Sequence, residues 1–376
     1  MKKLNEKQWG EFPFPKIFDI KKGFYNKRPE DSGDGSIPFL GATDSNNGVT
    51  RFLTMEAIEA GSKTGDANNA PLSKKVFPGG AIAVTNNGSV GHAYFQATKF
   101  TCSHDINPLY PRKQKANIDI SQFLIKAVEK QGELFQYARK WRPIRMVKSK
   151  IMLPTDADGQ PDYAYMEQYA TSKRAELIVR YKKFVEKQLD GLEARKIPTL
   201  EEKDWVPFPI SEIFTTLVGG KGNGLSNMKK QLSGANYIGA TNRNNGVLCS
   251  VELNKQTRRM VQEGNCIGFI KNGDGSAGYA IYKAEKFIST SDVLYGYADW
   301  INMHTGLFFV SAQDKIKSKY SHGYKRNVKH LKRDRVMLPV NEMGQPDYAY
   351  MEQYTKNMMY KKYQQYLKFI GFDRPA

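Results

Sequence analysis

Two short motifs hold residue types that could carry catalysis, and the first concerns base methylation. Asn107-Pro-Leu-Tyr110 is close to the Asn-Pro-Pro-Tyr box of adenine methyltransferases. The second proline is absent, no glycine-rich cofactor loop precedes the motif, and Asp292-Val-Leu-Tyr295 later in the chain keeps only Leu-Tyr. We therefore interpret Asn107–Tyr110 as a loop before a helix.

The second motif has the form of a nuclease site. Pro161-Asp162 followed by Glu201-Glu202-Lys203 matches a Pro-Asp…Glu-x-Lys pattern, but a long predicted helix separates the two pieces. Pro346-Asp347 repeats the first piece without the second. Carboxylates are stabilised at the positive N-terminal end of a helix, so helix capping accounts for both aspartates.

Other catalytic signatures fail on their spacing. Residues 219–224 are glycine-rich but lack the Gly-Lys-Ser/Thr ending of a P-loop. Gly88-Ser89 and Gly275-Ser276 lack the preceding glycine of a nucleophile elbow. We expect no catalytic residue and no metal site, because the histidines have no metal-ligand spacing. They are His92, His104, His304, His322 and His330.

Two clusters of cations suit a polyanion. Each precedes a long predicted helix, and Trp141, Tyr320 and Tyr324 lie among the cations. Lysine and arginine bind the phosphate backbone of DNA, and a solvated basic face is the alternative. The predicted DNA-binding residues are Arg139, Lys140, Arg142, Arg145 and Lys148 in the first cluster and Lys325, Arg326, Lys329, Lys332 and Arg333 in the second.

Loops rich in asparagine and glycine are the second candidate for DNA contacts. An asparagine amide can pair with adenine through two hydrogen bonds, although turn formation explains any single asparagine as well. The candidates are Thr43, Asn46, Asn47, Asn86, Asn87 and Ser89 in the first half of the chain and Thr241, Arg243, Asn244, Asn245, Lys271, Asn272 and Ser276 in the second.

The net charge of the chain points to the same kind of partner. The charge is +19 and the pI is about 9.5, which nucleic acid would neutralise. Three widely spaced cysteines predict reduced thiols, and the first residues lack the apolar core of an export signal. We therefore expect a cytoplasmic protein. The sequence has no apolar run of eighteen residues, so we predict no membrane span.

The chain is a tandem duplication. Residues 159–169 and 344–354 both read Gly-Gln-Pro-Asp-Tyr-Ala-Tyr-Met-Glu-Gln-Tyr. Residues 41–49 and 239–247 share Gly-Ala-Thr-x-x-Asn-Asn-Gly-Val in the same order. The globular parts have otherwise diverged, and the first has about eleven extra residues near 61–71. We infer a shared task for the repeated helix start and different tasks for the globular parts.

Each copy is expected to combine a mixed sheet with one or two helices. Residues 81–85 and 266–270 are apolar runs typical of buried strands, and residues 278–282 read as another strand. Residues 121–138 and 301–319 look helical. The predicted class of each globular part is therefore α+β.

A long helix is predicted after each globular part. Residues 163–196 contain no proline and have a helical apolar stripe, which predicts a helix about 50 Å long. Pro161 and Pro346 suit the two helix starts, and the second helix is shorter. Two such helices are expected to pair as an antiparallel coiled coil.

The order of these motifs resembles the specificity (S) subunits of type I restriction–modification systems and of the related type IIB enzymes. It runs from Trp9 through the Asn/Gly loops to Ile-x-Leu-Pro and a Glu-Gln helix, and it does so twice. Glu167-Gln168 and Glu352-Gln353 match the Glu-Gln that opens the family's spacer helices. The stretch before each Glu-Gln departs from the commoner proline-rich lead-in, so both assembly types stay open.

The resemblance implies a non-catalytic subunit with internal pseudo-two-fold symmetry, which reads a bipartite, asymmetric double-stranded DNA target. Its partners would be two DNA methyltransferase subunits, with a restriction or motor subunit as a further member. S-adenosylmethionine, Mg²⁺ and ATP would belong to those partners, and this chain would hold no cofactor. The implied parts are target-recognition domains 1–158 and 199–343 and spacer helices 159–198 and 344–376.

The repeated helix start is the predicted docking surface for the methyltransferase subunits. One partner type that docks twice would keep both starts alike. The alternative is that the same residues only pack the helix pair. The predicted partner-binding residues are Tyr163, Tyr165, Met166, Tyr348, Tyr350 and Met351.

Two other functions are compatible with the sequence. A DNA-modifying enzyme with an unrecognised active site would act on DNA alone, whereas a coiled-coil scaffold would hold other proteins without reading DNA. Incubating the chain with DNA, Mg²⁺ and S-adenosylmethionine distinguishes the first, and DNA binding at low salt distinguishes the second.

Overall fold

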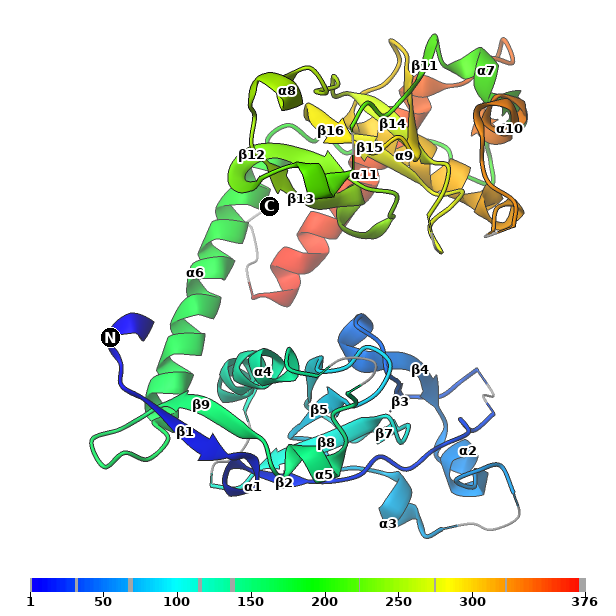
Figure 1. Ribbon diagram of the computed structural model, residues 1–376. Helices are drawn as coiled ribbons and strands as arrows, with labels where there is room; N and C mark the ends of the chain where they lie inside the picture. Colours follow the sequence, from blue (N-terminus) through cyan, green and yellow to red (C-terminus); the bar gives the residue numbers. More distant parts are fainter. Residues whose placement is uncertain are drawn as a thin grey trace. The chain divides into compact units, whose positions relative to one another are not determined.

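A computed structural model describes residues 2–30, 33–66, 70–113, 117–135, 139–222, 224–273, 275–321 and 323–371 (Figure 1). The chain divides into two compact units, residues 1–180 and 181–376. The boundary falls inside the long helix α6 (Tyr163–Leu189). We call the two parts unit 1 and unit 2.

The strands described in unit 1 form sheets of order β2-β8-β5-β6, β4-β3-β7 and β1-β9. Neighbouring strands are antiparallel except β3 and β7, which are parallel. The strands are β1 (Trp9–Pro13), β2 (Phe18–Ile20), β3 (Ile37–Leu40), β4 (Val49–Leu53), β5 (Ala81–Thr85), β6 (Ala93–Gln96), β7 (Thr101–Cys102), β8 (Ile106–Pro111) and β9 (Lys150–Pro154). The helices before α6 are η1 (Leu4–Glu6), α1 (Phe14–Ile17), η2 (Asn46–Gly48), α2 (Met55–Ala60), α3 (Leu72–Lys75), α4 (Ile118–Gly132) and α5 (Pro143–Met146).

Unit 2 repeats this topology strand for strand, with the orders β11-β17-β14-β15, β13-β12-β16 and β10-β18. Its parallel pair is β12 and β16, in the place of β3 and β7. The strands are β10 (Trp205–Pro209), β11 (Thr216–Gly219), β12 (Lys230–Ile238), β13 (Val247–Val251), β14 (Cys266–Ile270), β15 (Ala280–Lys283), β16 (Phe287–Ser289), β17 (Val293–Tyr297) and β18 (Arg335–Pro339). The helices after α6 are α7 (Ile210–Ile213), η3 (Leu225–Asn227), η4 (Arg243–Gly246), α8 (Lys255–Arg258), α9 (Met303–Gln313), η5 (Asp314–Lys319), α10 (Val328–Arg333) and α11 (Tyr348–Phe369).

One helix covers the four-stranded sheet of each unit, and an asparagine begins that helix. In unit 1 the helix is α4, which lies against the sheet (Figure 1). The Asn117 side chain accepts a hydrogen bond from the Ile120 N–H at the start of α4. Asn302 accepts from the N–H groups of His304 and Thr305 at the start of α9. Such caps satisfy N–H groups that have no partner within the helix.

The apolar runs predicted as strands are β5 and β14, and every residue of both is buried. The predicted helix 121–138 is α4, which starts at Ile118 and ends at Gly132, and residues 136–138 lie outside the described part. Residues 301–319 form α9 followed by the 3-10 helix η5. The helical prediction is thus confirmed in both places with shifted ends.

Two sequence interpretations are wrong. Asn107–Tyr110 does not form a loop, because it lies in strand β8 with Asn107 buried. Helix α6 ends at Leu189, so its 27 residues span about 40 Å rather than 50 Å. Gly191 lies two residues past its end.

The end of α6 packs on α11 inside unit 2. Val185, Leu189 and Leu367 form a buried cluster. The Tyr181 and Tyr366 rings lie 4.6 Å apart, and those of Phe184 and Tyr363 lie 6.3 Å apart. The contact residues therefore ascend along α6 as they descend along α11, so the two helices are antiparallel where they meet. Among the described residues, the helices lack the combination of length and apolarity that crossing a membrane requires.

Candidate nucleic-acid interface

The Asn/Gly loop of each unit is a turn between two strands. Asn46 and Asn47 have φ of 50° and 53° in the β3–β4 turn, and Asn244 and Asn245 have φ of 47° and 48° in the β12–β13 turn. Asparagine tolerates this left-handed region better than other side chains do. Turn formation, the alternative reading of these asparagines, therefore explains why both copies read Asn-Asn-Gly.

The amides of these asparagines also bind the protein itself. The Asn47 amide donates to the Phe95 carbonyl of β6 at 3.1 Å. Asn245 donates to the Tyr282 carbonyl of β15 at 2.9 Å, and Asn244 donates to Val247 at 3.1 Å. The bonds of Asn47 and Asn245 hold each turn against the neighbouring strand. Residues 44–47 and 242–245 are exposed, whereas Thr43 and Thr241 are half-buried.

Each unit has a second loop, which joins β5 to β6 in unit 1 and β14 to β15 in unit 2. Two of the DNA contacts predicted in these loops are wrong. Asn86 is buried and donates to Asn107 Oδ1 at 2.6 Å. Ser276 is buried and donates to Asn242 Oδ1 at 3.0 Å. Both predictions are wrong because these side chains hold the loops together from inside. Asn87, Ser89 and Asn272 are half-buried, and Asn87 donates to Asp105.

The two loops of each unit lie against each other. In unit 1 a Cβ on Gly88 of the second loop would lie 3.3 Å from the Ala42 Cβ, and the hydroxyl of Tyr94 in β6 donates to the Thr43 carbonyl at 2.9 Å. In unit 2 the Ser276–Asn242 bond joins the loops, and a Cβ on Gly273 would lie 2.3 Å from the Ala240 oxygen. Such a close approach requires glycine at position 273.

In each unit a main-chain hydrogen bond joins the basic segment to the first residue of the second loop. The Trp141 N–H donates to the Asn86 carbonyl at 3.1 Å, and the Arg326 N–H donates to the Lys271 carbonyl at 3.0 Å. The structure thus brings together the three segments that the sequence predicts as DNA-binding. The exposed predicted cations are Arg139, Arg142, Arg145, Lys148, Arg243, Lys325, Lys329, Lys332 and Arg333, whereas Lys140 and Lys271 are half-buried.

The prediction that Arg326 binds phosphate is wrong, because its side chain is fully buried. Its Nε donates to Asp334 Oδ2 at 2.9 Å, and its guanidinium lies over the rings of Phe269 and Tyr320. Burial lowers the pKa of Arg326, and the charge of Asp334 opposes that shift. Trp141 and Tyr320 are buried as well, so among the aromatic residues of these clusters Tyr324 is the exposed one.

Four of the six predicted partner-binding residues are buried, which contradicts the prediction for them. Tyr165, Met166, Tyr350 and Met351 are buried, and Met166 and Met351 belong to the cores of their own units. As placed, they offer a partner almost no surface. Tyr163 is half-buried, and Tyr348 is half-buried and stacks on Trp300 with ring centroids 4.7 Å apart.

The identity of the two helix starts has a structural cause, since each start makes the same bonds. The Tyr165 hydroxyl donates to the Lys2 carbonyl and the Tyr350 hydroxyl to that of Pro198, both at 3.0 Å. Each start therefore fastens the segment that leads into its own globular part. The matching bonds continue at the caps and at the following glutamates.

The caps use the aspartates of the nuclease-like pattern. Asp162 accepts from the Tyr165 N–H and pairs with Lys7 at 2.7 Å. Partial burial raises the pKa of Asp162, but the hydrogen bonds from Lys7 and the Tyr165 N–H and the charge of Lys7 together outweigh it and leave that pKa below its usual value. Asp347 accepts from the Tyr350 N–H and pairs with Lys203 at 2.9 Å. The capping interpretation is confirmed.

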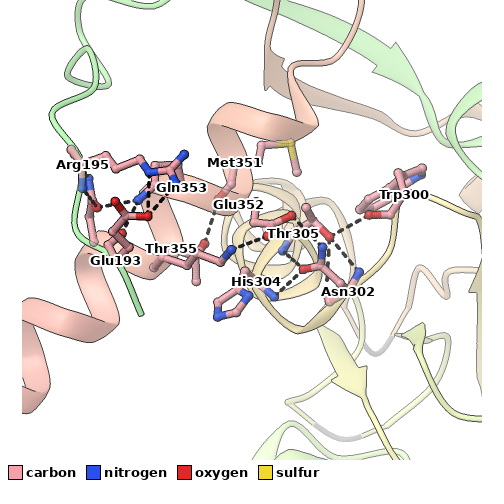
Figure 2. Close-up of polar contacts among 12 residues, drawn as sticks. Glu193, Arg195, Trp300, Asn302, His304, Thr305, Met351, Glu352, Gln353 and Thr355 are labelled. Carbon is pink, nitrogen blue, oxygen red and sulfur yellow. Dashed lines mark hydrogen bonds and ion pairs between the residues drawn. The ribbon is translucent and has the colours of Figure 1, made fainter. Parts of the chain in front are cut away.

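The glutamate of each Glu-Gln pair binds the asparagine that begins the core helix. Asn117 donates to Glu167 at 2.7 Å, and Asn302 donates to Glu352 at 2.9 Å (Figure 2). Lys356 lies 2.5 Å from Glu352. The hydrogen bond from Lys356 is the main cause that lowers the pKa of Glu352, opposed by partial burial and supported by Asn302.

The glutamine of the second pair faces the chain that follows α6. Gln353 donates to the Glu193 carbonyl at 2.8 Å (Figure 2). Asn357 receives a bond from the Arg195 N–H at 3.0 Å and donates to the Arg195 carbonyl at 2.7 Å. These bonds hold residues 193–195 on α11 in place of a continued helix α6.

One cationic hollow was missed by the sequence reasoning. Lys21, Lys22, Lys63 and Lys74 line a cavity of about 610 Å³ in unit 1, with Asp66 as the carboxylate of the lining. Lys63 lies in the insertion that only the first copy carries, and this insertion was the signal in the sequence. In the described part of the chain, no three His, Cys, Asp or Glu side chains gather as a metal site would require.

The comparisons with known proteins agree with this duplicated arrangement. The family model of the type I restriction modification DNA specificity domain matches residues 6–178 and again residues 202–367. The chain belongs to this family. It is 32% identical over 180 residues to the type II restriction enzyme BgcI specificity subunit S.BcgI of Heyndrickxia coagulans. That match covers 48% of this chain and 48% of the relative, about half the length of each.

Two solved structures are similar to the whole chain at low identity. The type I restriction-modification S subunit from M. genitalium matches 99% of this chain and 94% of its own, with 17% identity and a TM-score of 0.45. The HsdS subunit from Thermoanaerobacter tengcongensis matches 96% of this chain and 90% of its own, with 10% identity and a TM-score of 0.30.

Proposed function

We propose that this chain is the DNA-reading specificity subunit of a restriction–modification enzyme and has no catalytic role of its own. The observation that carries the proposal is the same in both units. Two polar loops and an exposed basic segment are joined by hydrogen bonds into one surface. The exposed cations suit phosphate, and the loops suit base edges.

The two surfaces are expected to read different half-sites. Their loops differ in sequence, since Asp44-Ser45 in the first turn corresponds to Asn242-Arg243 in the second. The cationic hollow lined by Lys63 also belongs to unit 1. The target would therefore be bipartite and asymmetric. Two methyltransferase subunits would bind the chain and supply S-adenosylmethionine chemistry, with a restriction or motor subunit as a further partner.

The test is DNA binding at increasing salt. Contacts to six to ten phosphates would lose roughly three to five decades of affinity between 50 and 200 mM salt. Arg142→Ala or Lys329→Ala should reduce the salt slope by about one phosphate, whereas Lys187→Ala in α6 is the matched control. A flat salt response, or equal effects of all three variants, would refute DNA reading by these segments. Methylation or cleavage of DNA by the chain alone, with Mg²⁺ and S-adenosylmethionine, would favour a DNA-modifying enzyme instead.

We also propose that the contacts between α6 and α11 belong to an antiparallel coiled coil that sets the distance between half-sites. Four residues inserted after Leu177 would lengthen α6 by about 6 Å. The preferred gap between half-sites should then grow by one or two base pairs, with both half-sites unchanged. Methylation-site mapping in cells that carry the variant measures this, and an unchanged gap would contradict the ruler role.

A further inference from the structure

Two reciprocal hydrogen bonds hold the Asn-Asn-Gly turn of unit 1 on the strand that follows the second loop. The Asn47 amide donates to the Phe95 carbonyl of β6 at 3.1 Å, and the Gln96 amide donates back to the Asn47 carbonyl at 3.0 Å. Hydrogen bonds are directional, so two of them at one residue restrict both the position and the rotation of the turn. We call this pair of bonds clamp 1.

Unit 2 has the same pair of bonds with a different donor. The Asn245 amide donates to the Tyr282 carbonyl of β15 at 2.9 Å, and the Lys283 ammonium donates to the Asn245 carbonyl at 3.3 Å. Lys283 is the last residue of β15, as Gln96 is the last residue of β6. The two donors therefore hold equivalent places. We call this pair of bonds clamp 2.

Both donors are buried, which is unusual for their residue types. The exposed fraction is 5% for Gln96 and 1% for Lys283. Burying a polar group costs free energy unless the group is hydrogen-bonded, and a buried ammonium also needs a counter-charge. An apolar side chain would fill either place without this cost. Packing alone therefore does not account for a donor at this place in both units.

The residue two places after the donor differs between the units in the way that the donor requires. Lys283 pairs with Glu285 at 2.8 Å, and Asn236 of β12 donates to the same carboxylate oxygen at 3.1 Å. Thr98 holds the matching place in unit 1, where the neutral Gln96 needs no counter-charge. The donor and its neighbour have thus diverged together, whereas the bond to the turn carbonyl is present in both units.

We propose that Gln96 and Lys283 are positioning residues for DNA reading, each of which holds the turn of its own unit where the turn meets a half-site. The turns present the exposed residues 44–47 and 242–245. Recognition of base edges depends on polar groups that supporting hydrogen bonds keep in a fixed geometry. A main-chain carbonyl accepts the bond, so one kind of clamp serves turns that carry different side chains. This inference rests on the proposed function, in which the turns read bases.

The test measures how strongly the full-length chain prefers its own target, which methylation-site mapping in cells identifies. The preference for each half-site is the ratio of two affinities, for the intact target and for DNA with that half-site scrambled. Gln96→Met removes the donor of clamp 1, and Lys283→Met with Glu285→Thr removes that of clamp 2 without leaving a carboxylate unpaired. Each variant should lower one preference about ten-fold, and the two should affect different half-sites.

A matched exchange separates the bond from the side chain that makes it. Lys283→Gln with Glu285→Thr places the residues of unit 1 in unit 2 and differs from the clamp 2 variant only in having a donor. It should keep both preferences within about two-fold of the wild type. Lys286→Met is the control, because it removes an exposed lysine of the same region that pairs with Glu263. It should leave both preferences unchanged.

Hydrogen exchange of β5 and β14 should match the wild type in every variant, whereas the turn peptides should exchange faster in the two Met variants. Unchanged preferences in folded Met variants would overturn the inference, and so would a fall of both preferences in either one. A lost preference in the folded exchange variant would also overturn it, which decides the matter even if a Met variant does not fold. A wild type that prefers no sequence would refute the proposed function itself, so the two failures are distinguishable.

Discussion

Trp141 of unit 1 and Arg326 of unit 2 hold equivalent places and have opposite chemistry. Both side chains are fully buried, and both main-chain N–H groups bind the first residue of the second loop. The Trp141 indole donates to Ser149 Oγ at 3.0 Å, whereas the Arg326 guanidinium donates to Asp334 at 2.9 Å. A neutral hydrogen bond in one unit is thus an ion pair in the other.

The main chain around the two pairs is alike. The Ser149 carbonyl accepts from the N–H of Phe14 at 3.0 Å, and the Asp334 carbonyl accepts from that of Ile210 at 2.9 Å. These two bonds hold the end of the basic segment on α1 or α7, while the bonds of the Trp141 and Arg326 N–H groups hold its start beside the loops. The frame of the proposed DNA-reading surface therefore depends on main-chain bonds, and the pocket behind it accepts different side-chain pairs.

The largest expected effect is on the ion pair. Asp334→Ala leaves the buried Arg326 charge without its partner and should cost about 3–5 kcal/mol of stability. Ser149→Ala removes one neutral hydrogen bond and should cost about 1 kcal/mol. Hydrogen exchange of peptides from each unit measures the two losses separately. Equal losses of stability would show that the ion pair contributes no more than the neutral hydrogen bond.

A combined variant tests the ion pair itself. Arg326→Met with Asp334→Leu and Tyr320→Phe makes the pocket of unit 2 apolar, as that of unit 1 largely is; Tyr320→Phe is included because the Tyr320 hydroxyl donates to Asp334. Replacing a buried ion pair by apolar residues is often neutral or stabilising by about 1–4 kcal/mol. Hydrogen exchange in α10 and β18 should therefore slow or stay unchanged, and faster exchange would show that the ion pair itself is needed.

The helix caps should differ by a smaller amount. Asn302 accepts from two N–H groups at the start of α9, whereas Asn117 accepts from one at the start of α4. We expect Asn302→Ala to cost about 2 kcal/mol and Asn117→Ala about 1 kcal/mol. Chemical denaturation of the full-length variants measures both. The reverse order would contradict the assignment.

The smallest expected effect depends on pH. The bond from Lys356 holds the pKa of Glu352 below its ordinary value, so the ionised Glu352 stabilises the folded state at pH values above that ordinary value. The contribution is lost as the pH falls through the lower pKa of the folded state. The wild type should therefore lose more stability than Glu352→Gln between pH 6 and pH 3, by thermal melting. Glu342→Gln, on an exposed loop, is the control and should follow the wild type.

The places where the sequence prediction failed share one physical cause. Arg326 lies among exposed lysines in the sequence, but it aligns with Trp141 and is buried. Tyr165 and Met166 fit the pattern of a docking surface, yet the unit uses them to fasten its own leading segment and core. Composition and spacing state which residue types are near one another along the chain. They do not state which face of an element meets the core.

The sequence by itself determined the duplication, the α+β class, the buried strands β5 and β14, the caps at Asp162 and Asp347, and the family. All of these depend on local periodicity, on end effects of helices or on the repeat, which are written along the chain. Only the tertiary structure decided that the loops and the basic segment share one surface and that Asn86, Ser276 and Arg326 lie inside. These depend on contacts between residues far apart in sequence, where burial selects the side chain that the core needs.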